Sequence, residues 1–154
     1  FVNNTQTAPG RFNLFNYRNA TLIADYGHNP DAIQALVCAI ENIPSRKRSV
    51  VISAAGDRRD EDIRQQTRIL GDAFDEVVLY QDKCQRGRAD GEVLSLLREG
   101  LENARRTQKI REIIGEAIAI DAALSNLQDG DLCLILVDQV EQSLGQINNR
   151  IASG

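Results

Sequence analysis

The sequence of 154 residues contains no methionine, so it lacks the initiator residue of an unprocessed translation product. We therefore expect part of a longer protein, with residues 1–10 as a linker from a missing upstream domain and 11–154 as one domain. No apolar run approaches the roughly 18 residues that a membrane-spanning helix needs. Residues 1–5 also lack the charged-then-apolar plan of a signal peptide. These absences predict a domain with no membrane partner.

The sequence has no excess of positive charge. Its 18 Lys and Arg residues are outnumbered by 22 Asp and Glu residues, which gives a net charge of −4. Such a chain has no global basic field to attract nucleic acid or anionic lipid. The 42% hydrophobic and 26% charged content is ordinary for a globular protein, and the length allows one domain with a sizeable core.

Cysteine is scarce, and no CxxC pair is present. Cys38, Cys84 and Cys133 are widely separated, which argues against a disulfide framework or a zinc cluster and favours a reduced cytoplasm. Cys38 and Cys133 lie in apolar runs, so we predict that both fill the core. Cys84 has no histidine partner in the sequence, which argues against a nucleophilic role.

Short apolar runs alternate with amphipathic stretches of about a dozen residues along the whole chain. The predicted strands are residues 11–17, 20–26, 49–55, 76–81, 109–114 and 132–137. The predicted helices are residues 30–42, 61–74, 89–101, 116–127 and 139–151. This alternation predicts an α/β fold in three layers, with right-handed crossovers and a mostly parallel sheet. The wholly apolar run 132–137 belongs at the centre of that sheet.

Ligands of open parallel sheets bind at the carboxyl ends of the strands. Asp25 ends a predicted strand there and can accept hydrogen bonds from the hydroxyls of a sugar. His28, the single histidine, and Asn29 follow it, with Asn29 as N-cap and Pro30 as first residue of the next helix. The N-terminus of that helix suits a phosphate. The alternative is that Asn29 and Pro30 are no more than a good helix cap.

A second loop at this edge carries six consecutive ionised residues. They are Asp57, Arg58, Arg59, Asp60, Glu61 and Asp62. Glu61 and Asp62 are explained by the dipole at a helix start, but Arg58 and Arg59 are not. Because aspartate pairs bidentately with guanidinium, mixed charge here can bind a zwitterionic or guanidinium-bearing ligand. A solvated charge run is the alternative.

The third loop places Arg86 and Arg88 just before a predicted helix, where they can hold a carboxylate or a phosphate or form a plain surface turn. Several phosphate-binding and catalytic motifs are missing: GxxxxGK[ST], GxGxxG, HExxH and GxSxG do not occur. The domain therefore cannot by itself hold a triphosphate in the manner of a P-loop.

The run at residues 25–30 resembles the Asp-x-x-His-x-Pro-type motif of the Mur ligases and folylpolyglutamate synthases, which lies at the same strand-to-helix turn of their C-terminal domain. Residues 54–62 are similar to the Gly-Asp-Arg segment of that family. Together with residues 10–15 and 86–92, they resemble in particular the branch that makes cyanophycin. The resemblance covers about residues 9–137.

The resemblance implies a Rossmann-like C-terminal domain of an ATP-dependent acid–amino-acid ligase, inactive as an isolated fragment. The cyanophycin-forming branch activates the β-carboxylate of a poly-aspartate chain as an acyl phosphate, with ATP and Mg²⁺. The α-amine of L-arginine then attacks to form an isopeptide bond. In this family a central ATPase domain of the same chain holds the P-loop and most metal ligands. The C-terminal domain closes over ATP as a lid.

The resemblance also implies roles for individual residues. Asp25 matches the aspartate that contacts the ribose, with His28 and Asn29 beside the phosphates. We hypothesise that one acidic residue of the second loop receives the guanidinium of the incoming arginine: Asp57, Asp60, Glu61 or Asp62. We expect the basic residues to contact polymer carboxylates or the acyl phosphate: Arg58, Arg59, Arg86 and Arg88. No catalytic residue or metal ligand is assigned.

Two other readings remain open. One is a peptidoglycan-type or folate-type ligase with a different acceptor amino acid. The other is a catalytically inactive module that binds nucleotide or mediates assembly. Every version of the prediction requires Asp25, His28 and residues 56–62 to lie at one shared cleft.

Overall fold

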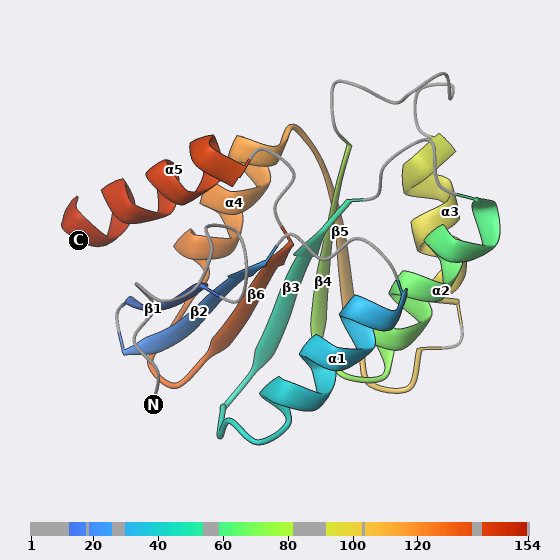
Figure 1. Ribbon diagram of the computed structural model, residues 1–154, viewed down its shortest axis with the longest axis horizontal. Helices are drawn as coiled ribbons and strands as arrows, with labels where there is room; N and C mark the ends of the chain where they lie inside the picture. The colour runs from blue at the N-terminus through green and yellow to red at the C-terminus, as the bar shows by residue number, and fades with distance from the viewer. Residues whose placement is uncertain are drawn as a thin grey trace.

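A computed structural model shows one six-stranded sheet with helices on both faces (Figure 1). It describes residues 13–17, 19–25, 30–53, 59–81, 92–102, 104–136 and 140–153. The strands are β1 (Asn13–Tyr17), β2 (Ala20–Asp25), β3 (Arg48–Ile52), β4 (Glu76–Gln81), β5 (Lys109–Ile114) and β6 (Leu132–Leu136). The described helices are α1 (Pro30–Ile40), α2 (Asp60–Gly71), α3 (Glu92–Gly100), α4 (Glu116–Ser125) and α5 (Val140–Ser153). The α/β prediction is confirmed.

The strand order is β1-β2-β6-β3-β4-β5, and only the β1–β2 pair is antiparallel. The last strand therefore inserts between β2 and β3, where all five of its residues are buried. This confirms the central position predicted from its apolar sequence. The predicted linker, residues 1–10, lies outside the described residues.

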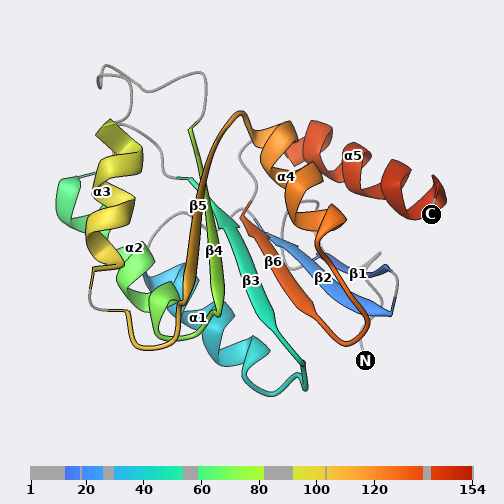
Figure 2. The same cartoon turned by 180° about the vertical axis from the view of Figure 1, so that it is seen from behind.

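The direction in which the chain crosses the sheet explains the two helical layers. From β2 to β5 the chain moves one way, and α1, α2 and α3 cover one face (Figures 1 and 2). From β5 it returns to the middle, so a right-handed crossover places α4 on the other face, where α5 joins it.

Alternate strand residues feed two cores, as the period of two requires. Val50 and Ile52 of β3 face the core under α1, α2 and α3, whereas Val51 faces the core under α4 and α5. Tyr80 of β4 and Ile147 of α5 belong to that second core and are fully buried.

The stripe predicted for α1 is confirmed. Its buried residues are Ile33, Leu36, Val37 and Ile40. Cys133 is buried as predicted, but the prediction for Cys38 is wrong because its side chain is exposed. Cys38 follows Val37 by one residue, which turns it about 100° away from the buried stripe. Cys84 lies outside the described residues.

Helices α2 and α3 touch closely enough to require glycine. A Cβ atom on Gly100 would lie 2.1 Å from the carbonyl oxygen of Arg64 and 2.1 Å from Oγ1 of Thr67. The Thr67 hydroxyl donates a hydrogen bond of 2.5 Å to the carbonyl of Leu97. Gly100 therefore allows the two helices to pack at this close distance.

Most element ends lie within a few residues of the predicted ones. Helix α2 ends at Gly71 rather than at residue 74, yet Phe74 is still fully buried just after it. In the described part of the chain, no helix combines the length and hydropathy needed to cross a bilayer.

Candidate functional site

The carboxyl ends of β2, β3, β4 and β6 lie at one edge of the sheet, because these strands run parallel (upper edge in Figure 1). Helices α1, α2 and α3 follow β2, β3 and β4 in the chain, so each begins at this edge. The strands that lead into the three predicted loops therefore share one edge.

Asp25 is the last residue of β2, as predicted, and only 8% of its surface is exposed. It pairs in register with Leu136, the last residue of β6. Strand β2 continues into α1 on one face of the sheet, whereas β6 is followed by α5 on the other face (Figures 1 and 2). Neighbouring strands whose helices depart to opposite faces form the crevice where ligands of α/β sheets bind. Asp25 lies at that point.

Helix α1 begins at Pro30, which confirms the predicted start. The proline ring sets a helical φ at a position whose N–H has no partner within the helix. His28 and Asn29 lie outside the described residues, so their placement beside a phosphate stays a prediction.

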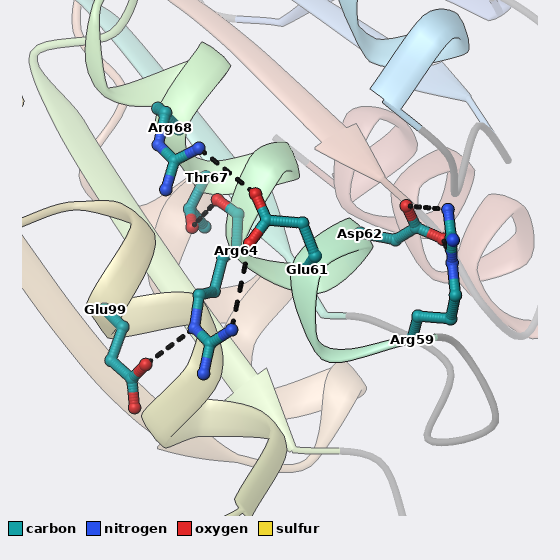
Figure 3. A network of polar contacts seen from close by, with 7 residues as sticks. All are labelled: Arg59, Glu61, Asp62, Arg64, Thr67, Arg68 and Glu99. Atoms are coloured by element: carbon teal, nitrogen blue, oxygen red, sulfur yellow. Dashed lines mark hydrogen bonds and ion pairs between the residues drawn. The ribbon is translucent and has the colours of Figure 1, made fainter.

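Helix α2 begins at Asp60, with Glu61 and Asp62 in its first turn and Arg59 as its N-cap. Nε and Nη2 of Arg59 donate hydrogen bonds of 3.1 Å each to the two carboxylate oxygens of Asp62 (Figure 3). The hydrogen bond to Asp62 and the charge of that carboxylate raise the pKa of Arg59. Asp62 thus already binds a guanidinium group bidentately.

Glu61 belongs to a second set of ion pairs on the outer side of α2 (Figure 3). Its carboxylate accepts a 3.4 Å hydrogen bond from Nη1 of Arg68 and lies 3.8 Å from Nη1 of Arg64. Nε of Arg64 also donates a 2.7 Å hydrogen bond to Glu99 of α3, and this bond raises the pKa of Arg64. For Glu61 this geometry favours helix stabilisation, the simpler of the two interpretations.

Two residues of this edge were not singled out from the sequence. The Tyr80 hydroxyl donates a 3.1 Å hydrogen bond to the carbonyl of Leu136 and lies 3.4 Å from Oε2 of Glu116. It therefore holds the end of β6 beside Asp25. Ser53 follows β3 and is 3% exposed, and its Oγ has no hydrogen-bond partner among the described residues. The only sequence signal for Ser53 was a polar residue directly after an apolar strand.

Of the predicted site residues, the structure places Asp25 and the start of α2 at the same edge of the sheet, and one cleft shared by them stays a prediction. Six others lie outside the described residues: His28, Asn29, Asp57, Arg58, Arg86 and Arg88. Within the described ranges, no group of three His, Cys, Asp or Glu side chains is arranged to hold a metal ion.

A protein-family model described as "Mur ligase, glutamate ligase domain" matches residues 10–136. Cyanophycin synthetase of Crocosphaera subtropica is 32% identical over 150 residues, which are 97% of this chain and 17% of that protein. UDP-N-acetylmuramoyl-L-alanyl-D-glutamate–2,6-diaminopimelate ligase of Alkaliphilus metalliredigens is 28% identical over 82% of this chain and 25% of that protein. The chain thus spans about a sixth to a quarter of the length of these relatives.

Solved structures agree with the fold. A UDP-N-acetylmuramoyl-L-alanyl-D-glutamate–2,6-diaminopimelate ligase matches with a TM-score of 0.79 and 20% identity, over 95% of this chain and 32% of that chain. FolC of E. coli in complex with ADP matches with a TM-score of 0.72 and 23% identity, over 96% of this chain and 33% of that chain. At these identities the likeness concerns the fold alone.

Proposed function

The chain belongs to the Mur ligase family by its glutamate ligase domain, and from this premise we propose that it is the C-terminal domain of a cyanophycin synthetase. The whole enzyme would use ATP to activate the β-carboxylate of a poly-aspartate chain as an acyl phosphate. L-Arginine would then form the isopeptide bond. Residues 1–10 would link this domain to a central ATPase domain of the same chain, in the cytoplasm.

The observation that carries the proposal is the position of Asp25. It is a buried carboxylate at the end of β2, where helices of adjacent strands leave to opposite faces of the sheet. Such a group suits the two hydroxyls of a ribose, since a carboxylate only accepts hydrogen bonds. The start of α1 at Pro30 adds a dipole end that favours phosphate. We propose that ATP binds here, with His28 and Asn29 beside its phosphates.

Mg²⁺ would neutralise phosphate charge and polarise the transferred group. We assign it mainly to the central domain, as the resemblance implies. The carboxylates at the start of α2 suit the guanidinium of the incoming amino acid, because Asp62 already shows the bidentate pairing that a carboxylate makes with a guanidinium.

That pair supports the proposed arginine site. The side chain of Asp62 is 27% exposed and that of Arg59 is 83% exposed, so a guanidinium bound by Asp62 lies at the protein surface. We propose that Asp57, Asp60, Glu61 or Asp62 receives the substrate guanidinium. Arg58, Arg59, Arg86 and Arg88 would contact the carboxylates of the polymer or the acyl phosphate.

A second candidate is a diaminopimelate-adding ligase, which the 28% identity to the Alkaliphilus enzyme favours. The two differ in acceptor, so the test is phosphate release from ATP by the longer protein that carries this domain. Arginine with a poly-aspartate primer should stimulate release, and meso-diaminopimelate with its UDP-linked substrate should not. The opposite pattern would transfer the proposal to the second candidate. ATP binding without release in either mixture would indicate an inactive module.

A further inference from the structure

A small, partly open cavity lies at the opposite, amino-terminal edge of the sheet, between the starts of β3, β4 and β6 and the end of α4. Its polar lining consists of Lys47, Ser49, Glu76, Asn126 and Asp131. The volume open to the centre of a water-sized sphere is about 10 Å³. That is about the least volume that holds one water molecule.

Two buried carboxylates line this cavity, and each has one oxygen that still needs a donor. Glu76 is 3% exposed and Asp131 is 5% exposed. Among the described residues, no hydrogen bond reaches Oε2 of Glu76 or Oδ1 of Asp131. The other oxygens are occupied: Oε1 of Glu76 lies 3.1 Å from Nζ of Lys47, and Oδ2 of Asp131 accepts the backbone N–H of Gln128 at 3.1 Å. A buried acceptor without a donor destabilises the fold, so such an oxygen favours any donor that fits beside it.

The surrounding charges decide what kind of ligand fits. Nη2 of Arg46 lies 2.8 Å from Oδ1 of Asp131, outside hydrogen-bonding geometry, and Nη1 of Arg111 lies 4.0 Å from Oε2 of Glu76. With Lys47, three cations therefore face two carboxylates. The negative charge is already balanced, so a metal ion would meet net repulsion. The two oxygens thus have cations nearby but accept no hydrogen bond from the described residues.

The strand register brings the two acids to the same place. Ser49 of β3 pairs with Glu76 on one side and with Cys133 on the other, two residues beyond Asp131. Burial raises the pKa of the Cys133 thiol to about 12; a hydrogen bond with Ser49 acts against this rise, and the charges of Glu76 and Asp131 add to it. Ser49, which lines the cavity, thus lies between Glu76 and Cys133 in the sheet.

We infer that this cavity binds one water molecule, which donates one hydrogen to Oε2 of Glu76 and the other to Oδ1 of Asp131. Ser49 and Asn126 offer it donors in return. The water would link the start of β4 to the turn before β6, on either side of β3. No direct hydrogen bond between Glu76 and Asp131 makes this link among the described residues. The site is independent of the proposed ligase activity.

The test uses crystals of this 154-residue chain at a resolution that shows ordered water, grown with Rb⁺ as a heavy analogue of K⁺. We expect one water peak within hydrogen-bond distance of both oxygens. An anomalous Rb⁺ peak there would replace the water by a cation and overturn the inference. An empty cavity, or a direct Glu76–Asp131 hydrogen bond, would overturn it as well.

Solution measurements give a second test. Water ¹⁷O relaxation dispersion counts long-lived internal water, and we expect the Ala123→Val variant to lose one molecule relative to wild type, because Ala123 lines the cavity and its added methyl groups would fill it. The matched control is Asp75→Asn, an acid next to Glu76 in the chain that does not line the cavity, and it should lose none. Should Ala123→Val fail to fold, Asp131→Asn is the second variant, since its amide can turn an N–H group into the cavity and compete with the water. An unchanged count in the folded variants would overturn the inference.

Discussion

The two edges of the sheet differ in how far their charged residues are buried and paired. At the amino-terminal edge, buried acids are closed in by basic residues of the same chain, as in the Lys47–Glu76 and Arg46–Asp131 pairs. At the carboxyl edge, Asp25 lies buried at the strand crossover while the charges of α2 stand largely exposed. One edge encloses its buried acids in ion pairs, and the other, where we propose that the ligand binds, keeps its ion pairs near the surface. We therefore expect variants in the packed helices and at the amino-terminal edge to change the free energy of unfolding. Variants at the carboxyl edge should change the affinity for substrates.

The largest effect should come from Gly100, in the helical layer that spans both edges. Gly100→Ala places a methyl group 2.1 Å from a backbone carbonyl, so we expect a loss of about 3 kcal/mol in the free energy of unfolding. Urea denaturation of this chain measures it. The matched control is Gly145→Ala in α5, where an added Cβ meets nothing within 4 Å and should stabilise by about 0.5–1 kcal/mol. Equal effects at both glycines would contradict the close contact of α2 and α3.

Asp25→Asn should act on affinity instead. Losing a charged hydrogen-bond acceptor for the ribose costs about 2 kcal/mol, so KM for ATP in the longer protein should rise about 30-fold. The control is Asp31→Asn, an exposed residue in the first turn of α1, which should change KM little. An unchanged KM for ATP in Asp25→Asn would show that Asp25 does not bind the nucleotide, and the proposed difference between the two edges would then be wrong.

A smaller change is expected at the start of α2. Replacing Asp62 by Asn removes a carboxylate that binds guanidinium bidentately, and KM for arginine should rise about tenfold while KM for ATP stays the same. Asp60→Asn, Glu61→Gln and Asp57→Asn complete the series. Unchanged kinetics in all four variants would reject the proposed arginine site.

At the other edge, Asp75 links stability to pH. Burial would raise the pKa of Asp75, but hydrogen bonds from the Arg106 side chain and the Arg48 backbone outweigh it and leave the pKa below its usual value. This contribution is present above the unfolded pKa, near 4, and disappears as the pH falls through the folded value. Arg106→Gln should cost about 1 kcal/mol at pH 7. The difference from wild type should shrink below pH 4 in thermal melts, and a constant difference would contradict the linkage.

The smallest expected signal is that of the isolated chain with ATP. Half of the phosphate contacts belong, in our proposal, to another domain, so isothermal titration should show no binding at micromolar concentrations. Micromolar affinity would contradict the idea of a lid that completes a shared site.

The sequence was most informative where one physical signal dominates. Continuous burial of β6 and the apolar stripe of α1 follow from periodicity, and Pro30 marks a helix start by its fixed φ. Cys38 was misplaced because an apolar run was equated with burial, although a helix buries only one face.

The rest depended on contacts between distant residues. The Arg64–Glu99 pair joins residues 35 positions apart, and the Tyr80 hydroxyl reaches a carbonyl 56 positions away. Neither leaves a local pattern, because each exists only after α2 meets α3 or after β6 enters the sheet. The motif at residue 25 predicts a nucleotide site, and the place of Asp25 between strands whose helices leave to opposite faces follows from the strand order.

That strand order has a consequence for how the molecule is made. Because β6 separates β2 from β3, the described strands form two groups, β1–β2 and β3–β4–β5, whose ladders are joined only through residues 132–136. During synthesis on the ribosome, β6 is made after the five other strands. The ladder that joins β2 to β3 can therefore form only after residues 132–136 have been made. Pairing partners more than a hundred residues apart, such as Leu22 and Cys133, is the kind of event that makes a fold form slowly.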